Sequence, residues 1–112
     1  MDKDATIGII GCGNMGEAVT KGIIFSGLVS AGDVYIYDID EEKTRHMKEY
    51  LDVNVANSSE ELCNECNVII LAVKPQDVED ALKEVWHVIN LSKLLISIAA
   101  GVTINKIKKS LK

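Results

Sequence analysis

Three glycines early in the chain have the spacing G-x-G-x-x-G, which is typical of a loop that binds the phosphates of a dinucleotide. An apolar run over residues 7–10 precedes Gly11, and a stretch compatible with a helix begins at Asn14. In this strand–turn–helix setting, Gly11 permits the tight turn, Gly13 lets the backbone approach a pyrophosphate, and Gly16 lets the helix pack close to the strand. Free N–H groups at the helix N-terminus then bind the phosphates, so we expect a dinucleotide site here rather than a turn alone.

A carboxylate follows at the distance expected for the acid that binds the adenosine ribose. Asp38 ends the next apolar run, residues 34–37, and lies 22 residues beyond Gly16, where about 20 are expected. A carboxylate here favours the two ribose hydroxyls of NADH and repels the 2′-phosphate of NADPH. The residues that follow carry mixed charges, with three acids and two bases: Asp40, Glu41, Glu42, Lys43 and Arg45. The local chemistry therefore favours NADH.

The totals indicate one globular domain. The chain has 112 residues, and its hydrophobic content of 47% permits a substantial core. A net charge of −5 and the lack of a basic cluster before the C-terminal tail argue against nucleic-acid binding. No apolar run reaches the roughly 20 residues of a membrane span, and the N-terminus lacks the apolar segment of a secretory signal. We therefore expect a cytoplasmic protein with neither a nucleic-acid nor a membrane partner.

The cysteines and histidines do not form a metal-binding pattern. Cys63 and Cys66 make a single C-x-x-C, and no second pair completes a four-thiolate zinc site. Nearby glutamates raise rather than lower a thiol pKa, so structural burial is favoured over a redox or metal function. His46 and His87 have no histidine close by in the sequence and are expected at the surface or half-buried. No metal site and no catalytic acid–base pair is predicted in this chain.

Strand and helix patterns alternate five times, which predicts an α/β fold: a doubly wound, Rossmann-type parallel sheet of about five strands with helices on both faces. The expected strands are residues 5–10, 34–37, 53–56, 68–73 and 94–98, and the expected helices begin near Asn14, Asp40, Ser58, Asp77 and Thr103. Asp40, Ser58 and Asp77 are predicted to cap their helices, and Gly27 to follow the first helix in a left-handed conformation. Residues 1–112 are predicted to be a single dinucleotide-binding domain.

Apolar spacing predicts the buried face of each helix. The expected inner residues are Met15, Val19 and Ile23 in the first helix, and Met47, Tyr50 and Leu51 in the second. For the later helices they are Val78, Ala81, Leu82, Val85 and Ile89, and then Ile104, Ile107 and Leu111. The short helix from Ser58 is expected to end near Cys63.

Three blocks in order along the chain resemble the N-terminal domain of the pyrroline-5-carboxylate reductases: Ile9–Gly16, Leu71–Pro75 and Ser97–Thr103. The resemblance extends over nearly the whole chain. It implies an oxidoreductase that takes hydride from NADPH or NADH and reduces the cyclic imine 1-pyrroline-5-carboxylate to proline, the last step of proline biosynthesis. Many members carry a small or hydroxyl residue where this chain has Asp38, so the resemblance allows NADPH while Asp38 favours NADH.

The resemblance also implies which residues contact the cofactor. The pyrophosphate loop would comprise Gly11, Cys12, Gly13, Asn14, Met15 and Gly16. A second segment would pass near the nicotinamide and its ribose: Ala72, Val73, Lys74 and Pro75. A third would line the cleft near the reacting ring: Ala99, Ala100 and Gly101. Lys74 is expected to face the cofactor with its backbone rather than to act as a catalytic acid.

One departure from the family bears on activity. Its members continue into a helical C-terminal domain that supplies the substrate-carboxylate site and the dimer interface, whereas this chain ends at Lys112, before a sixth strand. We therefore expect a cofactor domain alone, which binds dinucleotide, turns over little or no cyclic imine acid, and forms homo-oligomers through the edge strand 94–98. Two alternatives are the cofactor domain of a β-hydroxyacid or ketopantoate-type dehydrogenase, and a non-catalytic module that senses NAD(H).

Overall fold

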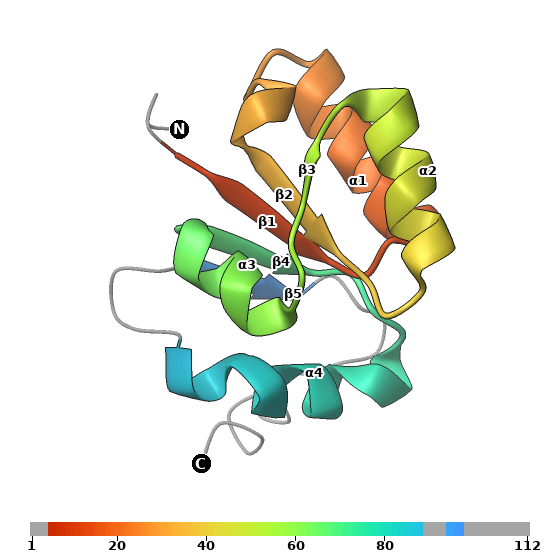
Figure 1. Ribbon diagram of the computed structural model, residues 1–112. Helices are drawn as coiled ribbons and strands as arrows, with labels where there is room; N and C mark the ends of the chain where they lie inside the picture. The colour runs from red at the N-terminus through yellow and green to blue at the C-terminus, as the bar shows by residue number, and fades with distance from the viewer. Residues whose placement is uncertain (1–4, 89–93, 98–112) are drawn as a thin grey trace.

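Five parallel strands form one sheet in the computed structural model, which describes residues 5–88 and 94–97 (Figure 1). They are β1 (Ile7–Ile10), β2 (Val34–Tyr37), β3 (Asn54–Val55), β4 (Val68–Leu71) and β5 (Leu94–Ser97), and their order in the sheet is β3-β2-β1-β4-β5. Strand β1 pairs with a neighbour on each side, so that Ile9 lies opposite Ile36 and Ile70. The predicted doubly wound parallel sheet is confirmed.

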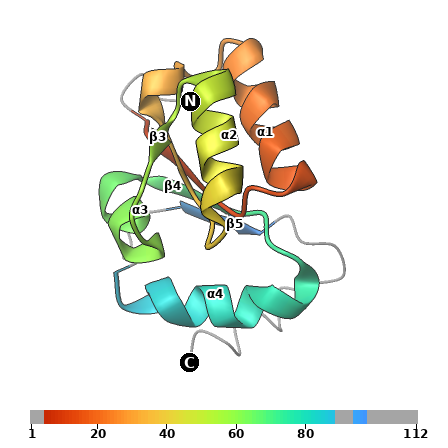
Figure 2. The ribbon, with the colours of Figure 1, turned by 45° about the vertical axis from the view of Figure 1, so that its right-hand side comes forward.

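Two pairs of helices cover the two faces of this sheet (Figures 1 and 2). Helices α1 (Asn14–Phe25) and α2 (Glu41–Leu51) lie on one face, and α3 (Ser59–Glu65) and α4 (Val78–Val85) lie on the other. Within β1, Ile7 and Ile9 belong to the core under α1 and α2, whereas Ile10 packs with residues of α3 and α4. Successive side chains of a strand point to opposite faces, so a strand covered on both sides is apolar throughout.

Most helix boundaries follow the local signals in the sequence. The Asp40 side chain accepts a hydrogen bond from the Glu42 N–H at 3.1 Å, and Ser58 Oγ accepts one from the Glu61 N–H at 3.0 Å. Gly27 has a φ of +79°, the left-handed conformation predicted after α1. These three predictions are confirmed, although α3 continues to Glu65 rather than ending near Cys63.

The predicted inner faces of α1 and α2 are partly wrong. Met15 is 43% exposed and Tyr50 is 60% exposed, whereas Gly16, Thr20 and Thr44 are buried. In α1 the close approach of Gly16 to the sheet turns the row Gly16–Thr20 inward and places Met15 outside that row. The Tyr50 ring instead stacks on the ring of His46, with centroids 6.1 Å apart.

The predicted cap at Asp77 is also wrong. Residues Pro75–Asp77 form a 3₁₀ turn, η2, so Asp77 has φ −101° and ψ −6° and its side chain makes no capping hydrogen bond. A capping residue needs extended backbone angles for its side chain to reach the first N–H groups of the helix. Two further 3₁₀ turns are η1 (Ala31–Asp33) and η3 (Trp86–Val88). The predictions for Ile89 and for the last helix lie outside the described residues.

Where the chain is described, none of its helices combines the length and the apolar character that crossing a bilayer would need.

Candidate cofactor site

The loop between β1 and α1 has the shape that its glycines predicted. Gly11 has a φ of +106°, and a Cβ atom there would lie 2.7 Å from the carbonyl oxygen of Ala72. A Cβ atom on Gly16 would overlap the carbonyl oxygen of Gly11. The turn and the close packing of α1 therefore require glycine at both positions.

Gly13 differs from these two glycines because the space beside it is open. Apart from its immediate chain neighbours, no atom of the described residues lies within 4 Å of the position that its Cβ would occupy, and its φ of −74° is accessible to any residue. Gly13 is the cap residue of α1 and, as a glycine, has no side chain that could cap the helix. The N–H groups of the first turn have no partner within the helix, and they give the helix end beside Gly13 the positive end of the helix dipole.

Asp38 connects the end of β2 to this loop. Its Oδ2 accepts a hydrogen bond from the Cys12 N–H at 2.7 Å, and its Oδ1 accepts one from the Asp40 N–H at 2.9 Å. Hydrogen bonds to a carboxylate are short and strong, so Asp38 holds the glycine loop in place. The sequence predicted a ribose contact and missed this anchoring role, since the partner of Asp38 is a backbone group 26 residues away.

The Cys12 thiol is buried beneath the same loop. Cys12 is 5% exposed, and burial, followed by the negative charge of Asp38, raises its pKa from 9.0 to about 12. The nearby charge of Lys43 opposes this shift. The side chain therefore stays a neutral thiol at physiological pH, which is an unreactive form of cysteine.

Cys12 is expected to react with iodoacetamide at pH 8 about a thousandfold more slowly in the folded chain than in urea, because the pKa shift reduces its thiolate fraction by that factor. Peptide mass spectrometry separates Cys12 from the other cysteines.

The free energy of unfolding should also fall as pH rises from about 9 toward 12, since only the unfolded thiol has lost its proton there. In Cys12→Ala this component of the pH dependence should vanish; equal labelling rates in both states would contradict the assignment.

The segment after β4 forms the opposite wall of the loop. The predicted strand 68–73 ends at Leu71, and the Ala72 N–H donates to the Ile10 carbonyl oxygen at 2.8 Å. The chain continues through Val73 to Lys74, whose extended backbone leads into η2. The connections that follow the adjacent strands β1 and β4 therefore lead to helices on opposite faces of the sheet, and α/β sheets of this kind bind ligands at such a switch point.

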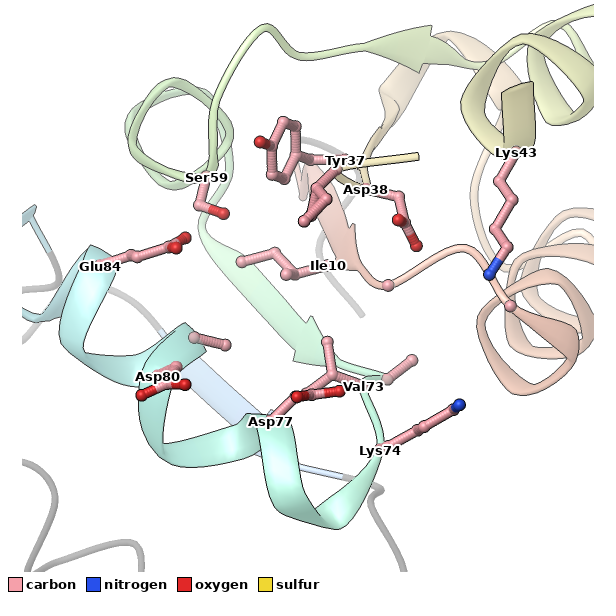
Figure 3. Close-up of a pocket in the computed structure, with 15 residues that line it drawn as sticks. Ile10, Tyr37, Asp38, Lys43, Ser59, Val73, Lys74, Asp77, Asp80 and Glu84 are labelled. Carbon is pink, nitrogen blue, oxygen red and sulfur yellow. The ribbon is translucent and has the colours of Figure 1, made fainter. Parts of the chain in front are cut away.

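A cavity of about 470 Å³ opens between these segments (Figure 3). Six of the predicted site residues line it: Gly11, Gly13, Asp38, Ala72, Val73 and Lys74. Cys12 and Gly16 are buried, whereas Asn14, Met15 and Pro75 are exposed and do not line the cavity. Ala99, Ala100 and Gly101 lie outside the described residues.

The remaining walls come from residues that the sequence did not point to as site residues: Ile10, Tyr37, Ile39, Lys43, Ser59, Asp77, Asp80, Ala81 and Glu84. Figure 3 shows the two lysines, Lys43 and Lys74, at one end of the cavity, and Asp80 and Glu84 at the other. The cavity therefore has a cationic end near the glycine loop and an acidic end near α4.

The other residues considered for chemistry lie away from the cavity. His46 and His87 are at the surface, as predicted, and each has a ring nitrogen 3.1 Å from a glutamate oxygen, of Glu17 and Glu60 respectively. Cys63 and Cys66 are buried in the core under α3. Within the part of the chain that the structure describes, no three His, Cys, Asp or Glu side chains are grouped as metal ligands.

The sheet order, the glycine loop and the cleft at the carboxyl ends of the strands define a Rossmann-type dinucleotide-binding domain. Residues 6–101 match the family described as "NADP oxidoreductase coenzyme F420-dependent", and the chain belongs to this family.

Within it, the chain is similar to pyrroline-5-carboxylate reductases. It is 37% identical over 105 residues to the reductase of Escherichia coli, covering 94% of this chain and 39% of that protein. The solved reductase of Coxiella burnetii superimposes with a TM-score of 0.88 at 28% identity, covering 96% of this chain and 40% of the other. The reductase of Plasmodium falciparum, solved with NADP bound, gives 0.85 at 29% identity, covering 99% and 39%. The predicted resemblance is confirmed, and the chain spans about 40% of the length of these relatives, at their N-terminal end.

Proposed function

We propose that this chain is the cofactor-binding domain of a pyrroline-5-carboxylate reductase, which transfers hydride from a nicotinamide dinucleotide to 1-pyrroline-5-carboxylate and forms proline. The observation that carries the proposal is the cavity at the carboxyl ends of the strands, with the glycine loop on one side and the segment after β4 on the other. The E. coli relative, 37% identical, supports the substrate.

The residues present fit a dinucleotide. The open space at Gly13 leaves room for a pyrophosphate against the first N–H groups of α1, and Asp38 borders the cavity where an adenosine ribose would follow. Val73 and Lys74 would border the nicotinamide half. The dinucleotide supplies the hydride, while this chain binds and orients it. In this proposal the proton for the imine nitrogen comes from outside the chain, which contributes no catalytic acid.

Calorimetric titration of the chain with NADH and with NADPH tests the cofactor site directly.

A chimera tests the reaction. In it, this chain replaces the matching segment of the E. coli reductase, and the oxidation of NADH or NADPH is measured in the presence of 1-pyrroline-5-carboxylate. We expect both binding and turnover in the chimera, and no turnover by residues 1–112 alone. A folded chimera that binds cofactor without reducing the imine would instead support the sensing alternative. Self-association and a cytoplasmic location remain predictions.

We further propose that NADH binds more tightly than NADPH. The Asp38 carboxylate lines the cavity and would accept hydrogen bonds from ribose hydroxyls but repel a 2′-phosphate. Lys43 also lines the cavity and attracts that phosphate, whereas Arg45 points its charge at Glu42, 3.5 Å away. The single carboxylate directly at the ribose decides the preference.

Asp38→Ser should shift the ratio of NADPH to NADH affinity by about tenfold toward NADPH, because it removes the repulsion and the ribose contact together. NADH affinity should also fall in absolute terms, since the loop loses its anchor at Cys12. Asp40→Ser is the matched control: it removes one nearby charge and keeps a capping side chain. An unchanged ratio in Asp38→Ser would mean that Asp38 only anchors the loop.

A further inference from the structure

Four polar and aromatic side chains form a surface cluster between α1 and α2, which lie side by side (Figures 1 and 2): Glu17 and Lys21 from α1, and His46 and Tyr50 from α2. One carboxylate oxygen of Glu17 is 3.1 Å from His46 Nε2, and the other is 3.7 Å from Lys21 Nζ. Lys21 Nζ also lies 4.8 Å from the centroid of the Tyr50 ring, which stacks on His46. The four side chains therefore contact one another in a closed ring.

This cluster lies beside the helix end that the proposed function, on which this inference rests, gives to the pyrophosphate. Glu17 is in the first turn of α1, directly after Gly16 of the glycine loop, and its N–H donates to the Gly13 carbonyl oxygen at 2.9 Å. A carboxylate at this position repels a pyrophosphate, and cations beside the carboxylate offset that repulsion. The net charge of the cluster therefore affects how strongly this helix end attracts the anion.

His46 is the member of the cluster that can change this charge near neutral pH. Histidine is the side chain that gains a proton between about pH 8 and 5, whereas glutamate, lysine and tyrosine keep their usual charge over most of that range. With His46 neutral, the charges of Glu17 and Lys21 cancel. With His46 protonated, the cluster is net positive. Within one turn of His46, α2 also carries residues of constant charge near neutral pH: Glu42, Lys43, Arg45, Lys48 and Glu49.

We infer that His46 couples dinucleotide binding to proton uptake. The protonated cluster binds the pyrophosphate more tightly, so binding of the dinucleotide draws a proton onto His46. By the same linkage, the affinity for the dinucleotide rises as pH falls from 8 toward 6. The His46 side chain is 66% exposed, so water and salt screen its charge and limit the coupling to about threefold.

Calorimetric titration of the full chain with NADH at pH 7, in two buffers of different ionisation enthalpy, counts the protons taken up. Threefold coupling corresponds to about a quarter of a proton per NADH, and to about twofold tighter binding at pH 6.5 than at pH 8. NADH is the probe because it lacks the 2′-phosphate of NADPH, which titrates in this range. His46→Gln should abolish both effects, whereas His46→Lys should bind NADH equally tightly at both pH values. A purely structural function of His46 would leave the proton count unchanged in His46→Gln.

His87→Gln is the matched control. His87 is the other of the chain's two histidines, is 60% exposed, and also has its Nε2 3.1 Å from a glutamate oxygen, but it lies in η3 and pairs with Glu60 of α3. Its replacement should leave the proton uptake intact. NADH binding without proton uptake would overturn the inference while leaving the proposed function standing, and so would uptake that persists in His46→Gln. Failure of NADH to bind would overturn the proposed function and this inference together.

Discussion

Gly16→Ala should destabilise the domain by about 3 kcal/mol, although alanine is the better helix former. The added Cβ would overlap the carbonyl oxygen of Gly11, which is a backbone atom and cannot rotate away. Gly11 itself is held, since its N–H donates to the Tyr37 carbonyl oxygen at 2.8 Å. Helix α1 would therefore have to move off the sheet. Urea unfolding followed by circular dichroism measures the change.

Gly22→Ala is the control, and its change in the free energy of unfolding should have the opposite sign. Gly22 lies in the same helix and is exposed, and outside its own helix backbone and chain neighbours no atom of the described residues lies within 4 Å of its Cβ position. Here only helix propensity acts, so the substitution should stabilise the domain by about 0.5–1 kcal/mol. If Gly16→Ala behaved like Gly22→Ala, the close contact between α1 and β1 would be disproved.

Gly13→Ala should leave the fold intact and weaken dinucleotide binding about a hundredfold. Its backbone angles suit alanine and the space is open, so the free energy of unfolding should fall by no more than about 1 kcal/mol, the cost of alanine in place of glycine at a helix cap. In the proposed complex, however, a methyl group would stand where the pyrophosphate meets the N–H groups of α1. Losing one or two charge-assisted hydrogen bonds accounts for the expected factor.

Titration calorimetry and urea unfolding on the same preparation separate these two effects. Gly32→Ala is the control, because Gly32 also has open space at its Cβ position but lies in η1, outside the cavity. It should change neither binding nor stability appreciably. Undiminished NADH affinity in Gly13→Ala would place the pyrophosphate elsewhere in the cavity.

The sequence determined the features that depend on neighbouring residues. The apolar runs became β1, β2 and β4, and the caps at Asp40 and Ser58 formed as their short spacing required. The distinct structural functions of Gly11 and Gly16 were also predictable, since a strand that turns directly into a helix leaves little freedom for the loop between them.

Only the tertiary structure decided which face each helix turns toward the sheet and which residues meet in the cavity. The rotation of α1 depends on how closely Gly16 approaches the sheet, which helical periodicity alone does not express, so Met15 was misplaced. The second role of Asp38 arises because β2 ends beside the glycine loop. Ser59 and Glu84 lie on different helices and share one end of the cavity only because α3 and α4 pack on the same face of the sheet. The sequence therefore determined the end of this cavity that the glycine loop forms, which is local, whereas packing alone decided the opposite end.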